Sequence, residues 1–222
     1  MKKILFVVIL AASLCFSACA VPLSNPTDTT APNTPTTNAN PTETDPTEPE
    51  ETAYIGPGYF PIQKEPAEFI FQSGAGGWRC VLSINRDGTF TGQYTDSEMG
   101  SIGEGYKATY YVCDFSGIFA DIEKVNEHTY RTQVFDITTS HTPGEEWIEN
   151  EIRYVAANPA GIYNEETKQV CESFIIYLPD TPISEVPEAF LNWWPYRGEQ
   201  KTTLSCYGIL NVATNDGFFY TE

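Results

Sequence analysis

Alternating apolar and polar residues predict strands along much of the chain. Over residues 78–84, Trp, Cys, Leu and Ile alternate with Arg, Val and Ser, which is the period of a half-buried strand. The sequence Asn-Arg-Asp-Gly at 85–88 then interrupts the alternation. Asp-Gly between two such segments is typical of a hairpin, because glycine readily takes positive φ. We therefore expect residues 89–94 to return as the second strand.

The patterned segments continue toward the C-terminus. Residues 96–105 contain three glycines and are expected to form a loop. The longest patterned segment follows at 106–122, and Gly117 within it indicates a bulge or sharp bend. Shorter strands are predicted at 129–137, 151–156, 173–178, 204–212 and 217–220.

One segment has helical spacing instead. Pro187 suits the first turn of a helix and Pro195 would end it, which predicts one short helix near 187–194. Many short strands in succession favour an antiparallel meander, because neighbouring parallel strands need crossover helices between them. Closing the meander removes exposed sheet edges. We predict a mainly β domain that forms a small lipocalin-like barrel, with a β-sandwich as the alternative.

The N-terminus carries a secretion signal. Two lysines precede the apolar segment 4–16, which is too short for a membrane span of about 20 residues. The sequence Phe-Ser-Ala-Cys at 16–19 follows and resembles the lipobox of bacterial lipoproteins. The resemblance implies that residues 1–18 are a signal peptide and that Cys19 carries a diacylglycerol. The protein would then be extracytoplasmic and lipid-anchored to the cell membrane; the alternative is an ordinary signal peptide.

A tether is predicted between the lipid and the domain. Residues 19–53 are rich in threonine and proline, contain several acidic residues, and have no aromatic, lysine or arginine side chain. This composition cannot form a core and favours extended conformations. We expect a disordered tether, with a glycosylated stalk as the alternative. Residues 54–222 remain for a single acidic β domain, within the usual domain size of roughly 100–200 residues.

Charge narrows the range of partners. The chain has 30 acidic and 12 basic residues and a formal net charge of −18. Nucleic acids and anionic lipid surfaces bind through clustered lysine and arginine. We therefore expect no nucleic-acid partner, and contact with the membrane only through the lipid on Cys19.

Four segments of the domain carry a second resemblance. They are GWRCVLSINRDGTFTGQY (77–94), YYVCDFSGIF (110–119), GEEWIENEIRYV (144–155) and YLPDTPISEVPEAFLNWW (177–194). They resemble lipoproteins of unassigned function from anaerobic Gram-positive bacteria. The resemblance agrees with a place in the cell envelope but implies no activity and no site residues.

Motifs for catalysis and metal binding are missing from the sequence. It contains no Gly-x-Ser-x-Gly elbow, P-loop, dinucleotide fingerprint or EF-hand loop. His128 and His141 are its only histidines and have no partner at metal-ligand spacing. We therefore predict no cofactor, metal or catalytic residue.

Two sets of residues are weaker candidates for binding. Carboxylates that could offer oxygen ligands to Ca²⁺ are Asp96, Glu98, Glu145, Glu146, Glu149 and Glu151. A solvated acidic surface is the favoured interpretation of these carboxylates. Tryptophans that could stack on sugar rings are Trp147, Trp193 and Trp194, and the favoured interpretation is that they cover the core.

The cysteines after the lipobox are Cys80, Cys113, Cys171 and Cys206. An even number outside the cytoplasm suggests two disulfides. A Cys80–Cys113 bridge is disfavoured because the two residues would lie two strands apart. Barrel closure brings the first and last main strands together, which predicts Cys80–Cys206 and leaves Cys113–Cys171. The alternative is four buried apolar thiols.

Two classes of function agree with these observations. The first is a membrane-anchored surface lipoprotein with a non-enzymatic β domain that binds a ligand or partner. The second is an envelope hydrolase with an unrecognised carboxylate site. A deep polar cleft with two carboxylates would favour the hydrolase, and a closed barrel with an apolar mouth would favour ligand binding. A solid core would instead indicate a protein–protein or purely structural role.

Overall fold

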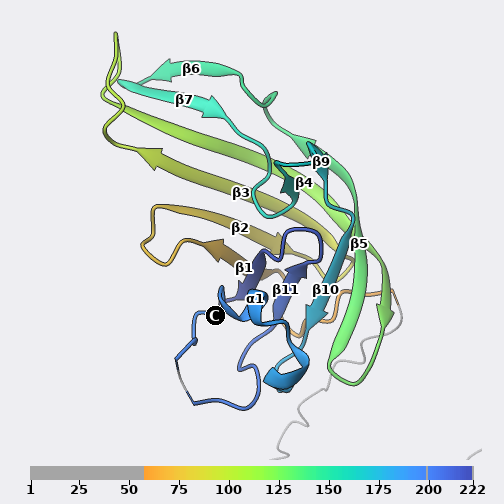
Figure 1. Cartoon of the computed structure of the whole chain (residues 1–222). Coiled ribbons are helices and arrows are strands. Elements are labelled where there is room, and N and C mark those ends of the chain that lie inside the picture. The colour runs from red at the N-terminus through yellow and green to blue at the C-terminus, as the bar shows by residue number, and fades with distance from the viewer. Residues whose placement is uncertain (1–57, 199, 222) are drawn as a thin grey trace, which may run out of the picture. The chain divides into compact units, whose positions relative to one another are not determined.

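The computed structural model describes residues 58–198 and 200–221 (Figure 1). The predicted signal peptide, Cys19 and the predicted tether lie outside these residues. The strands are β1 (Ala67–Gln72), β2 (Trp78–Ile84), β3 (Thr89–Glu98), β4 (Ala108–Lys124), β5 (Thr129–Thr139), β6 (Glu146–Glu149), β7 (Ile152–Ala156), β8 (Tyr163–Asn164), β9 (Gln169–Val170), β10 (Ser173–Tyr177), β11 (Gly208–Asn211) and β12 (Gly217–Tyr220). The helical elements are the 3₁₀ turn η1 (Ile183–Glu185) and the one-turn helix α1 (Glu188–Leu191). Within the described part of the chain, no helix has the length and apolar character needed to cross a membrane.

Eight strands form a closed antiparallel barrel in the order β1-β2-β3-β4-β5-β10-β11-β12. Each strand pairs with its neighbour in this order, and β12 returns to β1 with Phe69 opposite Tyr220. The mainly β, lipocalin-like meander predicted from the sequence is therefore confirmed, and the sandwich alternative is not. Closure pairs the backbone N–H and C=O groups that an open sheet would leave without hydrogen bonds at its edges.

The β2–β3 hairpin shows how the sequence sets the local structure. Buried residues alternate along β2, with Cys80, Leu82 and Ile84 facing inward. In the turn, the Asp87 carboxylate accepts hydrogen bonds from the backbone N–H and the hydroxyl of Thr89, at 2.9 and 2.6 Å. Gly88 has φ +86°, and a Cβ there would lie 2.1 Å from the carbonyl oxygen of Phe119. Only glycine fits this turn.

The strand β4 has three partners. It pairs with β3 over residues 109–118, with β5 over residues 115–124, and in parallel with β7 over residues 108–112. The register against β5 shifts between Ser116 and Ile118, so the bulge predicted at Gly117 is confirmed. The β6–β7 hairpin thus continues the sheet beyond the barrel on the N-terminal half of β4 (Figure 1).

The structure departs from the predicted elements in several places, and its short strands β6, β8 and β9 have no counterpart among them. Strand β1 was not predicted, although its buried positions alternate as in β2. Strand β3 runs on to Glu98, into the segment predicted as a loop, because ten residues of β4 pair with it. The helix is shorter than expected, since α1 ends at Leu191.

Two apolar clusters lie on opposite sides of the barrel wall. The inner cluster fills the barrel with large side chains, among them Phe69, Leu82, Phe119, Phe174, Ile176 and Phe218. The outer cluster packs α1 and the segment around it against outward-facing residues of β10, β11 and β12. Its centre is Phe190, whose ring lies 4.6 Å from that of Phe219 and 5.4 Å from that of Tyr177.

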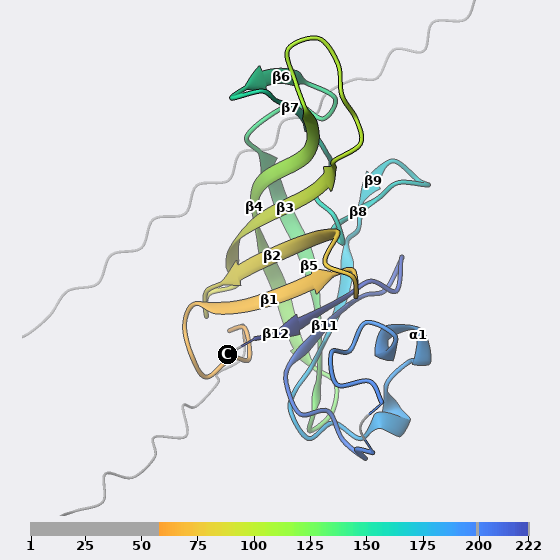
Figure 2. The same cartoon turned by 90° about the vertical axis from the view of Figure 1, so that its left-hand side faces the viewer.

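The two ends of the barrel differ. At one end the segment before β1 closes the interior: Phe60 and Ile62 are fully buried, and the Phe60 ring lies 5.4 Å from that of Phe119. The backbone N–H of Phe60 donates to the carbonyl of Arg86 in the β2–β3 turn at 2.8 Å. The opposite end carries the β1–β2 turn, the β11–β12 turn and the connection from β7 to β10 (Figure 2). We call these the closed end and the open end.

The connection after β7 folds over the open end and is held there by one buried side chain. Asn211 on β11 is fully buried and donates from Nδ2 to the carbonyl of Gly161 at 2.8 Å. Ile162 inserts into the inner cluster. Gly161 has φ +76°, and a Cβ there would lie 2.6 Å from the ring of Phe218. This close approach requires glycine.

Gly161→Ala is expected to destabilise the domain more than Gly144→Ala. Gly144 also has positive φ, but a Cβ there would meet no other atom within 4 Å, so its substitution introduces backbone strain alone. We expect about 1 kcal/mol for Gly144→Ala. Gly161→Ala should cost about 1–3 kcal/mol more, because the methyl group overpacks the core. Urea unfolding of both variants measures the difference, and equal losses would contradict the packing described here.

Candidate ligand-binding cleft

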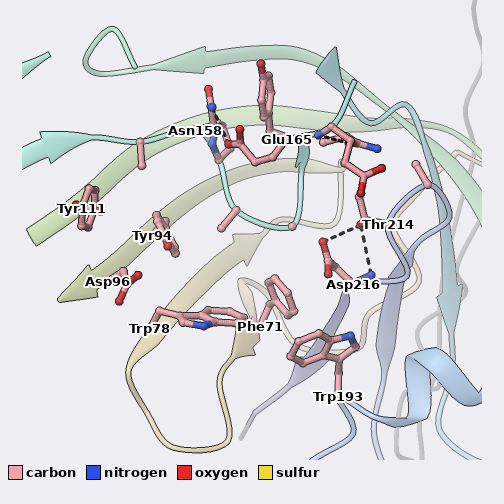
Figure 3. Close-up of a pocket in the computed structure, with 18 residues that line it drawn as sticks. Phe71, Trp78, Tyr94, Asp96, Tyr111, Asn158, Glu165, Trp193, Thr214 and Asp216 are labelled. Carbon is pink, nitrogen blue, oxygen red and sulfur yellow. Dashed lines mark hydrogen bonds between the residues drawn. The ribbon is translucent and has the colours of Figure 1, made fainter. Parts of the chain in front are cut away.

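A cleft of about 700 Å³ lies at the open end (Figure 3). It is bounded by the ends of β1 to β4, by residues 157–166 and by the β11–β12 turn. The side chains that define its chemistry are Phe71, Trp78, Tyr94, Asp96, Tyr111, Asn158, Tyr163, Glu165, Glu166, Trp193, Thr214 and Asp216. Aromatic rings and carboxylates thus dominate its lining.

Three aromatic rings form the floor of the cleft. The ring of Phe71 lies 4.7 Å from that of Trp78 and 4.9 Å from that of Trp193, with interplanar angles of 63° and 77°. The indole N–H of Trp193 donates to the carbonyl of Asn215 at 3.1 Å. Trp193 follows α1, so packing of Phe190 in the outer cluster also positions this ring. The floor is held by contacts independent of any ligand.

The acidic residues stand around this floor. In Figure 3, Asp96 lies beside Trp78 and Tyr94, Asp216 lies on the other side of Phe71, and Glu165 comes from the connection above. The fourth carboxylate is that of Glu166. No lysine, arginine or histidine is among the described residues that line the cleft.

Among the described residues, Glu165 is the one cleft carboxylate with a cationic partner. It accepts hydrogen bonds from Asn158 Nδ2 at 2.8 Å and from Lys168 Nζ at 2.9 Å. The hydrogen bonds from Lys168 and Asn158 lower the pKa of Glu165. Glu165 is therefore ionised and fixed in position.

Asp216 has the opposite environment. It is partly buried and accepts a hydrogen bond from the Thr214 hydroxyl at 2.7 Å. Burial raises the pKa of Asp216, and the Thr214 hydrogen bond only partly offsets this effect. Across the floor, burial and the neighbouring Asp96 raise the pKa of Tyr94 to about 12, so that the phenol keeps its proton.

Comparison with known proteins gives no relative from which a function could be inferred. No family model, curated protein or solved structure matches this chain. The cleft is therefore interpreted from its own residues.

The histidines and two of the three tryptophans singled out in the sequence lie away from the cleft. The His141 ring stacks on Trp147 at 4.5 Å, and its Nδ1 lies 3.3 Å from a Glu145 carboxylate oxygen. His128 lies in the β4–β5 turn. Trp194 is buried in the outer cluster, as expected for a residue that covers a core. Of the three tryptophans singled out, Trp193 is the one that lines the cleft.

The carboxylates considered as calcium ligands are dispersed. Glu146 pairs with Arg153 and Glu151 pairs with Lys107, both at 2.6 Å. Glu98 accepts a hydrogen bond from the Tyr111 hydroxyl at 3.3 Å. Within residues 58–198 and 200–221, no group of three or more potential metal ligands comes together.

The four cysteines are free and buried in the structure. The predicted Cys80–Cys206 and Cys113–Cys171 bridges are absent, which is a correction to the sequence-based expectation. Cys80 and Cys113 belong to the inner cluster, whereas Cys206 belongs to the outer cluster. The barrel wall therefore separates Cys80 from Cys206, and the four thiols act as small apolar side chains.

Sequence reasoning missed most of the cleft. Glu165 and Asp216 were not singled out, because each stands in a short polar segment without a motif. Tyr94 and Tyr111 were assigned only to strands. The one hint of the cleft in the sequence is that aromatic residues are frequent near the ends of the predicted strands. This does not reveal which strand ends meet in the folded domain.

The thiols are expected to be inert in the folded protein. Burial raises the pKa of Cys113 to about 11, and burial also raises the pKa of Cys80, so neither is a thiolate at neutral pH. Dithiothreitol should leave the melting temperature unchanged, and a thiol reagent should react with all four only after unfolding. A reduced melting temperature, or a bridged peptide in a non-reducing digest, would contradict the free thiols.

Asp216→Asn is expected to stabilise the domain at neutral pH. A carboxyl whose pKa is raised by folding favours the folded state when protonated and loses that contribution as the pH rises through its folded pKa. Asparagine removes the ionisation and can still accept the Thr214 hydrogen bond. The melting temperature should rise at pH 7, and the gain should shrink as the pH falls toward about 4. Glu127→Gln at the exposed β4–β5 turn is the control and should show no such trend.

Proposed function

We propose that the protein is a membrane-anchored surface lipoprotein whose barrel binds a small ligand in the cleft at the open end. One observation carries the proposal: at the open end of the barrel, a cleft has an aromatic floor with carboxylates around it. The function is binding, without chemical change of the ligand.

The dimensions and lining of the cleft support this function. Small-molecule sites usually have volumes of about 300–1,000 Å³ and combine apolar surface with a few fixed polar groups. The cleft, at about 700 Å³, lies within that range. Below its floor the barrel is filled by the inner cluster, so the ligand would rest on the end of the barrel and not within it.

The place of the N-terminal segment supports the arrangement at the membrane. Residues 58–62 lie at the closed end, where Phe60 contacts the β2–β3 turn. The described chain therefore begins at the end of the domain away from the cleft, which is compatible with a lipid-bearing tether of residues 19–53. Two acyl chains hold a protein stably on a membrane.

A hydrolase is the second candidate, and one observation favours it. Glu165 and Asp216 line the same cleft, and their surroundings move their pKa values in opposite directions. Such divergence distinguishes the acid from the base in many hydrolases. If this candidate is correct, nitrophenyl glycosides should be cleaved, and both Glu165→Gln and Asp216→Asn should abolish the cleavage.

Ligand binding is expected to depend on Trp193. We suggest screening a library of small amphipathic compounds against the full chain, made with Cys19→Ser so that no lipid is attached. Hits should compete with one another, and Trp193→Ala should weaken them roughly tenfold through lost aromatic contact. Trp147→Ala, which removes a tryptophan outside the cleft, is the matched control. Hits that depend on Trp147 and not on Trp193, or no hits at all, would contradict the proposal.

Lipidation is expected to depend on Cys19. In a bacterial host fed a labelled fatty acid, the wild-type chain should incorporate the label and fractionate with membranes, because the lipobox directs acylation of this thiol. The Cys19→Ser variant should do neither, while Cys15→Ser should behave as wild type. A labelled, membrane-bound Cys19→Ser variant would overturn the assignment.

A further inference from the structure

We infer that the ligand of the cleft is an organic cation, with an ammonium group set against Asp216 and an apolar part resting on the aromatic floor. This inference rests on the proposed function and names the chemical class of the ligand. Three observations support it: the side chains that line the cleft carry mainly negative charge, the floor offers aromatic ring faces, and the carboxylate oxygens have acceptor positions that no described contact uses.

The charge balance excludes an anionic ligand. Four carboxylates line the cleft, and only that of Glu165 pairs with a cationic side chain, Lys168. Within the described residues, Asp96 and Asp216 have no ion-pair partner. An anion would meet this uncompensated negative charge at short range, where the low dielectric of a partly enclosed site strengthens repulsion. A cation would be attracted for the same reason.

Unpaired carboxylates are common on so acidic a protein, but Asp96 and Asp216 differ from the other carboxylates because they line the cleft. Elsewhere on the domain, Glu123, Glu146 and Glu151 each pair with an arginine or lysine at the surface. Asp216 instead stands partly buried beside the aromatic floor. A neutral ligand that covered Asp216 would strip water from a charge without replacing it, which is unfavourable. An ammonium group would compensate the charge of Asp216 by forming an ion pair with it.

The carboxylate oxygens needed for such an ion pair are available. A carboxylate offers about four lone-pair positions. The described contacts of the Asp216 side chain use one of them, for the Thr214 hydroxyl at 2.7 Å. Asp96 accepts the backbone N–H of Ser97 at 2.7 Å and also interacts with Tyr94. Both carboxylates keep acceptor positions for a ligand in the cleft that they line.

The rings add attraction for a cation. The face of an aromatic ring is electronegative, and tryptophan binds cations best. The Trp78 and Trp193 rings are inclined at 61° with centroids 6.1 Å apart, and each is also steeply inclined to Phe71. Flat stacking of a sugar would favour one continuous platform, which these rings do not form. A compact cationic head group needs only one ring face and a nearby carboxylate.

The test compares choline with 3,3-dimethyl-1-butanol, which has the same shape but a carbon in place of the charged nitrogen. Binding to the full chain with Cys19→Ser is followed by calorimetry and by tryptophan fluorescence at constant ionic strength. Choline is expected to bind roughly tenfold tighter than the neutral alcohol. Asp216→Asn should remove most of this preference, whereas Glu127→Gln, with the same loss of charge at a distant turn, should keep it.

The results separate this inference from the proposed function. If the alcohol or a neutral disaccharide binds as tightly as choline, and Trp193→Ala weakens that binding, the cation inference is overturned while the ligand-binding function stands. If choline binds but Asp216→Asn and Glu127→Gln weaken it equally, binding follows net charge alone and the inference is also overturned. If neither these probes nor the compound library binds, the proposed function itself fails.

Discussion

The pairing of β12 with β1 is the constraint on which the rest of the structure depends. It joins the last strand of the chain to the first and turns an eight-stranded meander into a barrel without edges. Once the wall is closed, inward and outward positions on each strand face different surroundings. Phe218 on β12 packs inside and Phe219, the next residue, packs outside against Phe190. Both apolar clusters therefore depend on this short pairing of β12 with β1, which we call the β1–β12 seam.

Closure also explains why the cleft lies at one end. The segment before β1 fills the closed end with Phe60, whereas the cleft lies at the open end. There the long connection from β7 to β10 packs back onto the barrel through Ile162. Asn211 holds Gly161 over the interior, and the chain after α1 brings Trp193 to the rim along the outside of the wall. The floor and the acidic rim come from segments that only the closed barrel brings together.

Local features of the fold were predictable from the sequence, and its long-range features were not. The β2–β3 hairpin follows from alternation and from Asp87-Gly88, and the bulge in β4 follows from Gly117, because each signal spans only a few neighbouring residues. The cleft depends on which strand ends meet, and no local signal reports this for Asp216 or Trp193. The disulfide prediction was wrong for a related reason. It placed Cys206 on the same side of the wall as Cys80, whereas Cys206 packs outside the barrel.

Hydrogen exchange of individual amides tests closure most directly. If the β1–β12 seam holds the barrel together, amides in its ladder, such as those of Ile70 and Phe219, should exchange only when the whole domain unfolds, and their exchange should respond to denaturant like global unfolding. Amides of the β6–β7 hairpin, which lies outside the barrel, should exchange through local opening with little response to denaturant. Seam amides that exchange as readily as those of the β6–β7 hairpin would contradict a closed barrel.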